Sequence, residues 1–183
     1  VIAIDVNFSE PSGLGGVDDK SLASAVSNSK AKVVLPVQIN EANGETIRPL
    51  LIFQTGSIEA VVNILIEDGV ARKVDNYNGE LMSFGAVVAG QYKKDLPVPA
   101  RMRIDYAGPA KTFLTFPISD LLEDKIPERI YKDKVVMIGA TAPDLHDFFQ
   151  TPFGLLPGVE IHANAVGTLL SQNFYRELSA GFS

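Results

Sequence analysis

The sequence predicts an α/β fold, a three-layer sandwich built on a mixed, mostly parallel central sheet with one antiparallel hairpin. Short apolar runs such as Val1–Val6 and Val135–Ile138 alternate with segments of helical pattern, as in parallel α/β units. Asp68-Gly69 lies between two apolar runs, which is a strong signal for a hairpin turn. The chain has 183 residues, of which 46% are hydrophobic, enough for a sizeable core. We therefore expect residues 1–183 to form a single domain.

The first half of the chain is expected to hold two strands, one helix and the hairpin. In chain order these are a strand at Val1–Val6, a helix opened by Asp18, a strand at Ala31–Val37 and a hairpin over Ile58–Val74. Asp18 suits the start of a helix because its carboxylate can accept from the free N–H groups of the first turn. The polar segment Glu41–Arg48 is expected to be a loop.

The second half is expected to alternate helices and strands. In chain order these are a helix at Leu81–Ala89 ended by Gly90, a strand at Met102–Tyr106, a short helix at Pro117–Asp124 with Ser119 as its cap, a strand at Val135–Ile138 and a helix at Val159–Ser171. Because the strands at both ends of the chain are apolar throughout, we expect them to be neighbouring, parallel and central. Val159, Val166 and Leu170 form one helical stripe, which is expected to be buried against the sheet.

Charge and composition exclude several function classes. The formal net charge is -6 and the pI is about 4.9, and no basic cluster is visible, which argues against a nucleic-acid surface. The chain has no cysteine, so disulfides, thiolate catalysis and cysteine metal sites are excluded. No apolar run reaches the ~18 residues of a membrane span. The sequence opens inside a strand, and we expect it to be a domain of a longer chain that carries membrane segments.

The glycine-rich segment Gly13–Gly16 lies between a strand and a helix, where a dinucleotide-binding fingerprint would lie. That fingerprint needs GxGxxG, and its last position here holds Asp18, which would repel pyrophosphate. We therefore interpret the segment as a flexible loop and expect no cofactor.

Polar residues that follow two strands are the candidates for a ligand site. Ligands of parallel sheets bind at the carboxyl ends of strands, so Asp5 and the loop from Gly139 to Thr151 are expected to converge there. The candidate ligand-binding residues are Asp5, Asp144, His146, Asp147 and Thr151. Together they suit a small, partly polar ligand. Asp5 suits a turn acceptor equally well, and Asp147 can also order the loop through backbone N–H groups.

A metal site can be assembled on paper from Asp144, His146, Asp147, Glu160 and His162. Helical spacing argues against it, because Glu160 shares a face with Asn164 and His162 lies at the edge of the apolar stripe. We interpret His162 as a packed, hydrogen-bonded structural residue, with a ligand role as the alternative. Glu160 lies in the first helical turn, where the helix dipole stabilises a carboxylate. No metal is expected.

Several segments together resemble a known family. They are Val1–Val6, Glu67–Arg72, Arg103–Gly108, Lys132–Thr141, and the tail with Asp147, Thr151-Pro152 and Pro157–Ala165. The chain resembles the CHASE family, type two, which are cyclase/histidine-kinase-associated sensory extracellular domains. PGVEIHANA is the most specific motif, and the motif residues are Gly139, Glu160, His162 and Asn164. Residues 28–55 match no pattern of the family.

The resemblance implies a sensor module of a bacterial receptor. It implies a position on the extracytoplasmic face of the cell membrane, periplasmic or extracellular, before several transmembrane helices. The implied outputs are an adenylate or guanylate cyclase, a diguanylate cyclase, a histidine kinase or a serine/threonine kinase. The implied partner is a small-molecule signal of unknown identity. No catalytic residues are carried over.

Three functions from different classes compete. The first is a ligand-sensing domain of a membrane receptor. The second is a metal-dependent hydrolase-like enzyme that uses Asp5, Asp147 and a histidine. The third is a purely structural dimerisation module, which would form a homodimer. A ligand-sized cavity favours the first, an ion held by three side chains favours the second, and one large apolar face favours the third.

Overall fold

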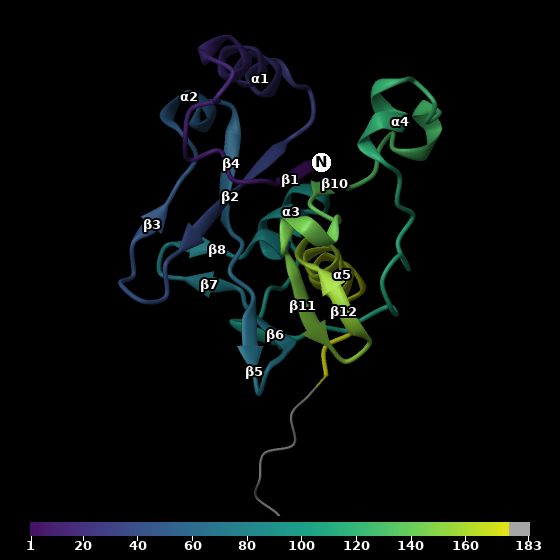
Figure 1. Cartoon of the computed structure of the whole chain (residues 1–183). Helices are drawn as coiled ribbons and strands as arrows, with labels where there is room; N and C mark the ends of the chain where they lie inside the picture. The colour runs from purple at the N-terminus through teal and green to yellow at the C-terminus, as the bar shows by residue number, and fades with distance from the viewer. Residues whose placement is uncertain (176–183) are drawn as a thin grey trace, which may run out of the picture.

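The computed structural model describes residues 1–175 and has the expected α/β sandwich fold (Figure 1). The central sheet contains β10 (Val136–Gly139), β1 (Ile2–Asp5), β2 (Val33–Ile39), β3 (Thr46–Ile47) and β4 (Ser57–Val61). β1 pairs in parallel with both β10 and β2, and β2 also pairs in parallel with β4. Only β3 is antiparallel, at the end of β2. The sheet is therefore mixed and mostly parallel, as predicted.

Helices cover both faces of this sheet and make three layers (Figure 1). α1 (Gly16–Asn28) and α2 (Leu51–Gln54) lie on one face, and α3 (Phe84–Tyr92) and α5 (Gly158–Ser171) lie on the other. Side chains of β2 alternate between the faces, because strand residues point to opposite sides in turn. Val33 and Leu35 pack in the α1 and α2 core, whereas Val34 packs in the larger core with α3 and α5.

A second, small sheet extends the larger core. It contains β5 (Leu65–Glu67), β6 (Val70–Asp75) and β9 (Arg101–Arg103), all antiparallel. Two short hairpins flank it, β7 (Tyr77–Asn78) with β8 (Leu81–Met82), and β11 (Phe148–Thr151) with β12 (Gly154–Pro157). Ala71 and Met102 of this sheet are buried in the same core as Ile161 of α5. The remaining short elements are α4 (Ile118–Leu122) and the 3-10 turns η1 (Glu128–Ile130) and η2 (Pro143–Leu145).

α3 and α5 approach each other closely. A Cβ atom on Gly85 of α3 would lie 3.0 Å from the Cβ of Ala165 in α5. α3 begins after Ser83, whose hydroxyl accepts from the backbone N–H of Ala86 and donates to the side-chain oxygen of Asn76 at 2.8 Å. This serine supplies the N-cap that the start of a helix needs. Gly90 lies inside α3 and does not end it, which corrects that expectation.

The structure corrects two expectations about strands. β10 pairs with β1 in parallel, as predicted, but it is the edge strand and is not central. β10 is nevertheless apolar because α5 packs over one of its faces. A strand at a sheet edge can be apolar when a helix covers it. The hairpin predicted over residues 58–74 is shorter. Its first part, β4, joins the central sheet, and the true hairpin is β5–β6 around Asp68-Gly69.

Three helix starts and loops also differ from expectation. Gly15 precedes α1, and the Asp18 side chain does not cap the helix but accepts from the hydroxyl of Ser12. α4 follows Pro117 and has no side-chain cap, so Ser119 does not fill that role. Residues 41–48 include the short strand β3, which the polar composition concealed. Only the last of these differences depends on tertiary pairing, because β3 forms against β2.

Candidate functional site

The carboxyl ends of β1 and β10 lie side by side. Asp5, the last residue of β1, is paired in register with Gly139, the last residue of β10. The loop that leaves Gly139 therefore begins beside Asp5, as expected for parallel neighbours. Gly139 has no room for a side chain, since a Cβ there would lie 2.6 Å from the Cβ of Val159 in α5. This close approach brings the first turn of α5 to the same edge of the sheet.

His162 of α5 lies next to Asp5. Its Nε2 is 3.9 Å from Oδ2 of Asp5, and the residue is only 6% exposed. The imidazole ring lies against the ring of Phe84 with 5.2 Å between centroids, and it makes a hydrogen bond with the backbone of Val62. The expectation of a packed, hydrogen-bonded histidine is confirmed.

Asp147 completes this group from the loop side. The backbone N–H of Gly158 donates to the carbonyl oxygen of Asp147 at 3.0 Å. A Cβ on Gly158 would lie 2.7 Å from Oδ2 of Asp147, so the carboxylate rests against the first residue of α5. The positive end of the helix dipole favours a carboxylate in that position. We refer to Asp5, Asp147 and His162 as the acid–histidine cluster.

Burial shifts all three pKa values in the acid–histidine cluster. Burial raises the pKa of Asp5 to about 6. Burial and the neighbouring charge of Asp5 raise the pKa of Asp147, although the hydrogen bond from Gly158 opposes this. Burial lowers the pKa of His162 to about 4, so its imidazole is neutral at pH 7. Removal from water disfavours the charged form of each group, which explains the opposite directions for acid and base.

The other predicted ligand residues lie outside this cluster. Asp144 belongs to η2 and is exposed, and His146 follows it, also exposed, with a left-handed backbone. Thr151 is buried at the turn between β11 and β12. Its hydroxyl donates to the carbonyl of Gly154 at 2.8 Å and accepts from the N–H of Phe153 at 3.1 Å. The structure thus brings Asp5, Asp147 and Gly139 together and separates Asp144, His146 and Thr151 from them.

A second polar group lies on another face of α5. Glu160 accepts from the N–H of Lys111 at 2.9 Å, Asn164 from that of Ala107 at 2.8 Å and Thr168 from that of Asp105 at 2.9 Å. We refer to Glu160, Asn164 and Thr168 as the polar stripe. All three are buried, and Glu160 lies in the first turn of α5, as expected.

The polar stripe holds an irregular segment whose backbone donors need partners inside the protein. Thr168 was not singled out from the sequence. The signal that could have found it is spacing, because Glu160, Asn164 and Thr168 recur every four residues on an otherwise apolar helix. Glu160 and His162 point to different neighbours, Lys111 and Asp5, in agreement with the predicted helical faces.

In the described part of the chain, no metal-binding group and neither of two surface cavities lies at the acid–histidine cluster. Among residues 1–175, no group of three or more His, Asp or Glu side chains is arranged to hold a metal ion. Two surface cavities of ≈ 240 Å³ and ≈ 410 Å³ lie elsewhere. The larger one is mostly apolar and lies over α3, and the smaller one lies beside β6 and β9.

Comparisons with known proteins place the chain in a family. The family model described as CHASE2 domain matches residues 1–181. The comparison with curated proteins and the comparison with solved structures found no match. In the described part of the chain, no helix combines the length and apolar character that crossing a membrane requires.

Proposed function

Because the chain belongs to the CHASE2 domain family, a family of extracellular sensory domains, we propose that it is the ligand-sensing domain of a bacterial membrane receptor. In this proposal the domain lies on the extracytoplasmic face of the cell membrane. A small, partly polar signal molecule binds near the loop that follows β10, and transmembrane helices after the domain relay the change to a cyclase or kinase.

The acid–histidine cluster is the observation that supports this assignment. Its three members come from the end of β1, the loop after β10 and the start of α5. A ligand that changed the position of Asp147 would act directly on Gly158, which donates to Asp147 and opens α5. A binding event can shift an equilibrium only through a difference in contacts between two states. In this proposal, the bond between Asp147 and Gly158 is the contact that differs between the two states.

α5 is suited to carry a displacement across the domain. The helix spans Gly158–Ser171 and is buried along most of its length. The polar stripe fixes it to the segment at residues 105–111 through three hydrogen bonds. A helix held in this way moves as a unit, because packed interiors transmit strain and compress little. In the proposed receptor, such a movement reaches the membrane helices beyond the C-terminal end of α5.

The alternative of a metal-dependent hydrolase has weaker support. CHASE2 domains are sensory and not catalytic. The alternative of a structural dimerisation module is favoured by one feature, the exposed apolar side chains of Leu114, Phe116, Ile118 and Leu122 around α4. Clustered exposed apolar residues are typical of interaction sites. Sedimentation of the 183-residue chain with and without Leu122→Ser tests the dimerisation alternative. A dimer that Leu122→Ser dissociates supports a structural module, whereas a sensing role does not depend on a dimer held by this segment.

A ligand screen by thermal shift tests the sensing proposal. A true ligand raises the melting temperature of the chain by mass action. We expect at least one small polar compound to do so, and Asp147→Asn to remove that shift while Asp124→Asn retains it. Asp124 is an exposed aspartate with a left-handed backbone that asparagine also adopts, so it is a matched control. If a compound stabilises Asp147→Asn as much as the original chain, the ligand site does not lie at this loop.

A further inference from the structure

The larger cavity lies over a face of α3 that differs from the face in contact with α5. Its volume is ≈ 410 Å³, within the roughly 300 to 1,000 Å³ of small-molecule sites. α3 contributes Ala86, Val87, Gly90 and Gln91, which share one face at helical spacing, whereas Gly85 points toward α5. None of these residues belongs to the acid–histidine cluster, so an inference drawn from this cavity goes beyond the proposed function.

The walls of the cavity are apolar and come from separate segments of the chain. β4, β8 and the residues that follow α3 supply Ile58, Met82, Leu96 and Val98. Together with Val87, these side chains pack against the larger core but are only partly buried. An apolar molecule in the cavity would remove more of this surface from water, which is favourable.

Gly90 keeps the cavity open. It lies inside α3 without a left-handed backbone, and a Cβ at this position would meet nothing within 4 Å. Neither a turn nor a close backbone contact therefore requires glycine here. What the glycine provides is space in the cavity, although glycine inside a helix is less stable than alanine.

The polar side chains that line the cavity have no partner among residues 1–175. They are Tyr77, Gln91 and Asp95, and no hydrogen bond or ion pair joins their side chains to the described part of the chain. Asp95 is the one charged residue among the described residues that line the cavity. Because a carboxylate only accepts hydrogen bonds, it favours a donor or a cation and repels an anion.

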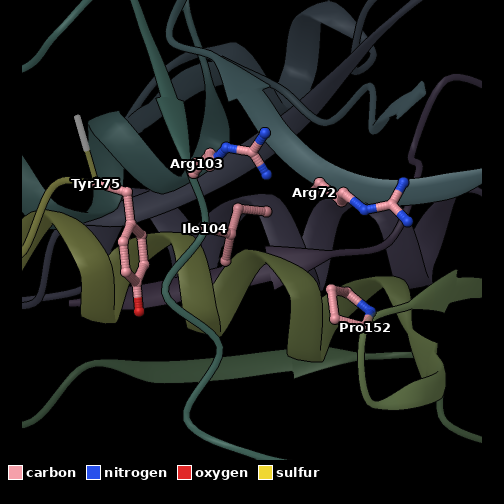
Figure 2. Close-up of a pocket in the computed structure, with 5 residues that line it drawn as sticks. All are labelled: Arg72, Arg103, Ile104, Pro152 and Tyr175. Atoms are coloured by element: carbon pink, nitrogen blue, oxygen red, sulfur yellow. The ribbon is translucent and has the colours of Figure 1, made fainter. Parts of the chain in front are cut away.

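The polar side chains of the smaller cavity, in contrast, already have interactions within the protein (Figure 2). The hydroxyl of Tyr175 donates to Oδ1 of Asp105 at 2.8 Å, and Arg72 donates to the carbonyl of Glu67 at 3.2 Å. Arg103 also has an interaction partner. Of the two cavities, the larger one is therefore the better candidate for a ligand site.

The wall at residues 96–98 contacts the end of α5. The side-chain amide of Gln172, which follows α5, donates to the carbonyl of Pro97 at 3.3 Å. Beyond the wall, the side-chain amide of Asn76 donates to the carbonyl of Pro99 at 2.9 Å. A ligand that packs against this wall acts on a segment bound to the C-terminal end of α5, whereas the acid–histidine cluster lies at the first turn of that helix.

We propose that this cavity binds a small apolar molecule that carries a hydrogen-bond donor, either an amine or a hydroxyl. The apolar body lies against Val87 and Gly90, and the donor faces Asp95. An anion of the same shape is disfavoured, because it would lie beside a like charge. Occupancy restrains the wall at residues 96–98 and, through Gln172, the end of α5.

NMR titration of the ¹⁵N-labelled 183-residue chain tests the proposal. The probes are benzylamine, benzyl alcohol and sodium benzoate, which share a ring and differ in charge, and sodium chloride keeps the ionic strength equal. We expect saturable shifts of the amide signals at residues 86–91 and 96–98 with the amine and the alcohol. Benzoate is expected to bind about tenfold more weakly or less, because Asp95 repels it. The proposal is overturned if neither the amine nor the alcohol gives saturable shifts there, or if benzoate binds as tightly as benzylamine.

Gly90→Leu fills the cavity and is the sharpest variant. It is expected to fold, because its Cβ meets open space and leucine favours a helix, and to weaken binding of both ligands about tenfold or more by occupying their place. Gly167→Leu is the matched control, since a Cβ on this helical glycine of α5 also meets nothing within 4 Å. It is expected to keep Kd within about twofold of the original, since distant sites act independently. An unchanged Kd in Gly90→Leu overturns the proposal.

Asp95→Asn separates the charge of the site from its shape. Asp95 has a left-handed backbone, which asparagine also adopts. The variant is expected to bind benzylamine several-fold more weakly and benzyl alcohol as before, because only the amine is charged. An unchanged ratio of benzylamine to benzoate affinity overturns the proposal, also where Gly90→Leu does not fold. Asp147→Asn is expected to bind the probes as the original chain does, so failure of this site is distinguishable from failure of the loop after β10.

Discussion

At the scale of single residues, Asp5 and His162 carry opposite pKa shifts within one buried contact. The pKa of Asp5 is raised to about 6, and that of His162 is lowered to about 4. Between pH 4 and 6, the folded protein therefore holds a protonated Asp5 and a neutral His162, whereas the unfolded chain holds an ionised aspartate and a protonated histidine. Both states bind one proton at this pair, so the two contributions to the pH dependence of stability cancel.

Replacement of Asp5 should reveal the contribution of His162. A histidine with a lowered pKa in the folded state stabilises the protein above its unfolded pKa, and that stability is lost as pH falls through the folded value. In Asp5→Asn we therefore expect the free energy of unfolding to rise between pH 4 and 6.5, by about 3 kcal/mol. Urea denaturation at pH 4.5, 5.5, 6.5 and 7.5 measures this slope relative to the original chain and to Asp124→Asn. Parallel curves for all three proteins would contradict the opposite pKa shifts of Asp5 and His162.

The residues of the site were only partly predictable. Asp5 and Gly139 could be found because carboxyl ends of parallel strands meet at one edge, and His162 because its helical position marks it as packed. Burial of Glu160 could not be foreseen, because its cover is the irregular segment near Lys111. Asp144 shows the reverse error, since a polar loop residue carries no sign of which way it will point.

At the scale of elements, α5 is the helix on which the larger core and the site depend. Val159 and Val166 are buried, as predicted, whereas Leu170 is only partly buried. Val166→Asp would place an unpaired charge in the core, and we expect it to cost about 3 to 5 kcal/mol of stability or to prevent folding. The neighbouring exposed position supplies the control, Gly167→Asp, which is expected to cost far less. Equal melting temperatures for the two variants would show that Val166 does not lie on the buried face of the helix.

The contact between α3 and α5 gives a second prediction for the same elements. A Cβ on Gly85 meets Ala165 at 3.0 Å, whereas one on Gly167 meets nothing within 4 Å. Gly85→Leu is therefore expected to destabilise the chain by about 1 to 3 kcal/mol through overpacking. Gly167→Leu is expected to be neutral or to stabilise it by up to about 1 kcal/mol, because leucine favours the helix. Chemical denaturation of both variants checks this, and the same loss at both positions would show that helix contact is not the cause.

Elements were easier to predict than their partners. The helix at residues 158–171 and the parallel pairing of β1 with β10 follow from periodicity and from apolar runs. The edge position of β10 could not be predicted in this way. An apolar run indicates that the faces of a strand are buried, but it does not indicate which strands pair on either side of it. For the same reason β4 was predicted as one arm of a hairpin, although it joins β2 in the central sheet.

At the scale of the whole molecule, the fold class was predictable because the pattern of alternating strands and helices allows few layer arrangements. The cavities were not, since each combines residues distant in sequence, such as Arg72 with Pro152 and Tyr175. A sheet edge that carries the acid–histidine cluster meets α5 at its first residue, and the polar stripe follows along the same helix.

The most direct test of the sensory role is the output of the full-length receptor with Asp147→Asn in this domain. The carboxylate of Asp147 lies against Gly158, the first residue of α5, so the loss of its charge should change the contact between the loop and the helix. We expect an altered basal output or a lost response to the signal, whereas Asp124→Asn retains both. A receptor with Asp147→Asn that keeps its basal output and its full response would contradict a role for this loop in sensing.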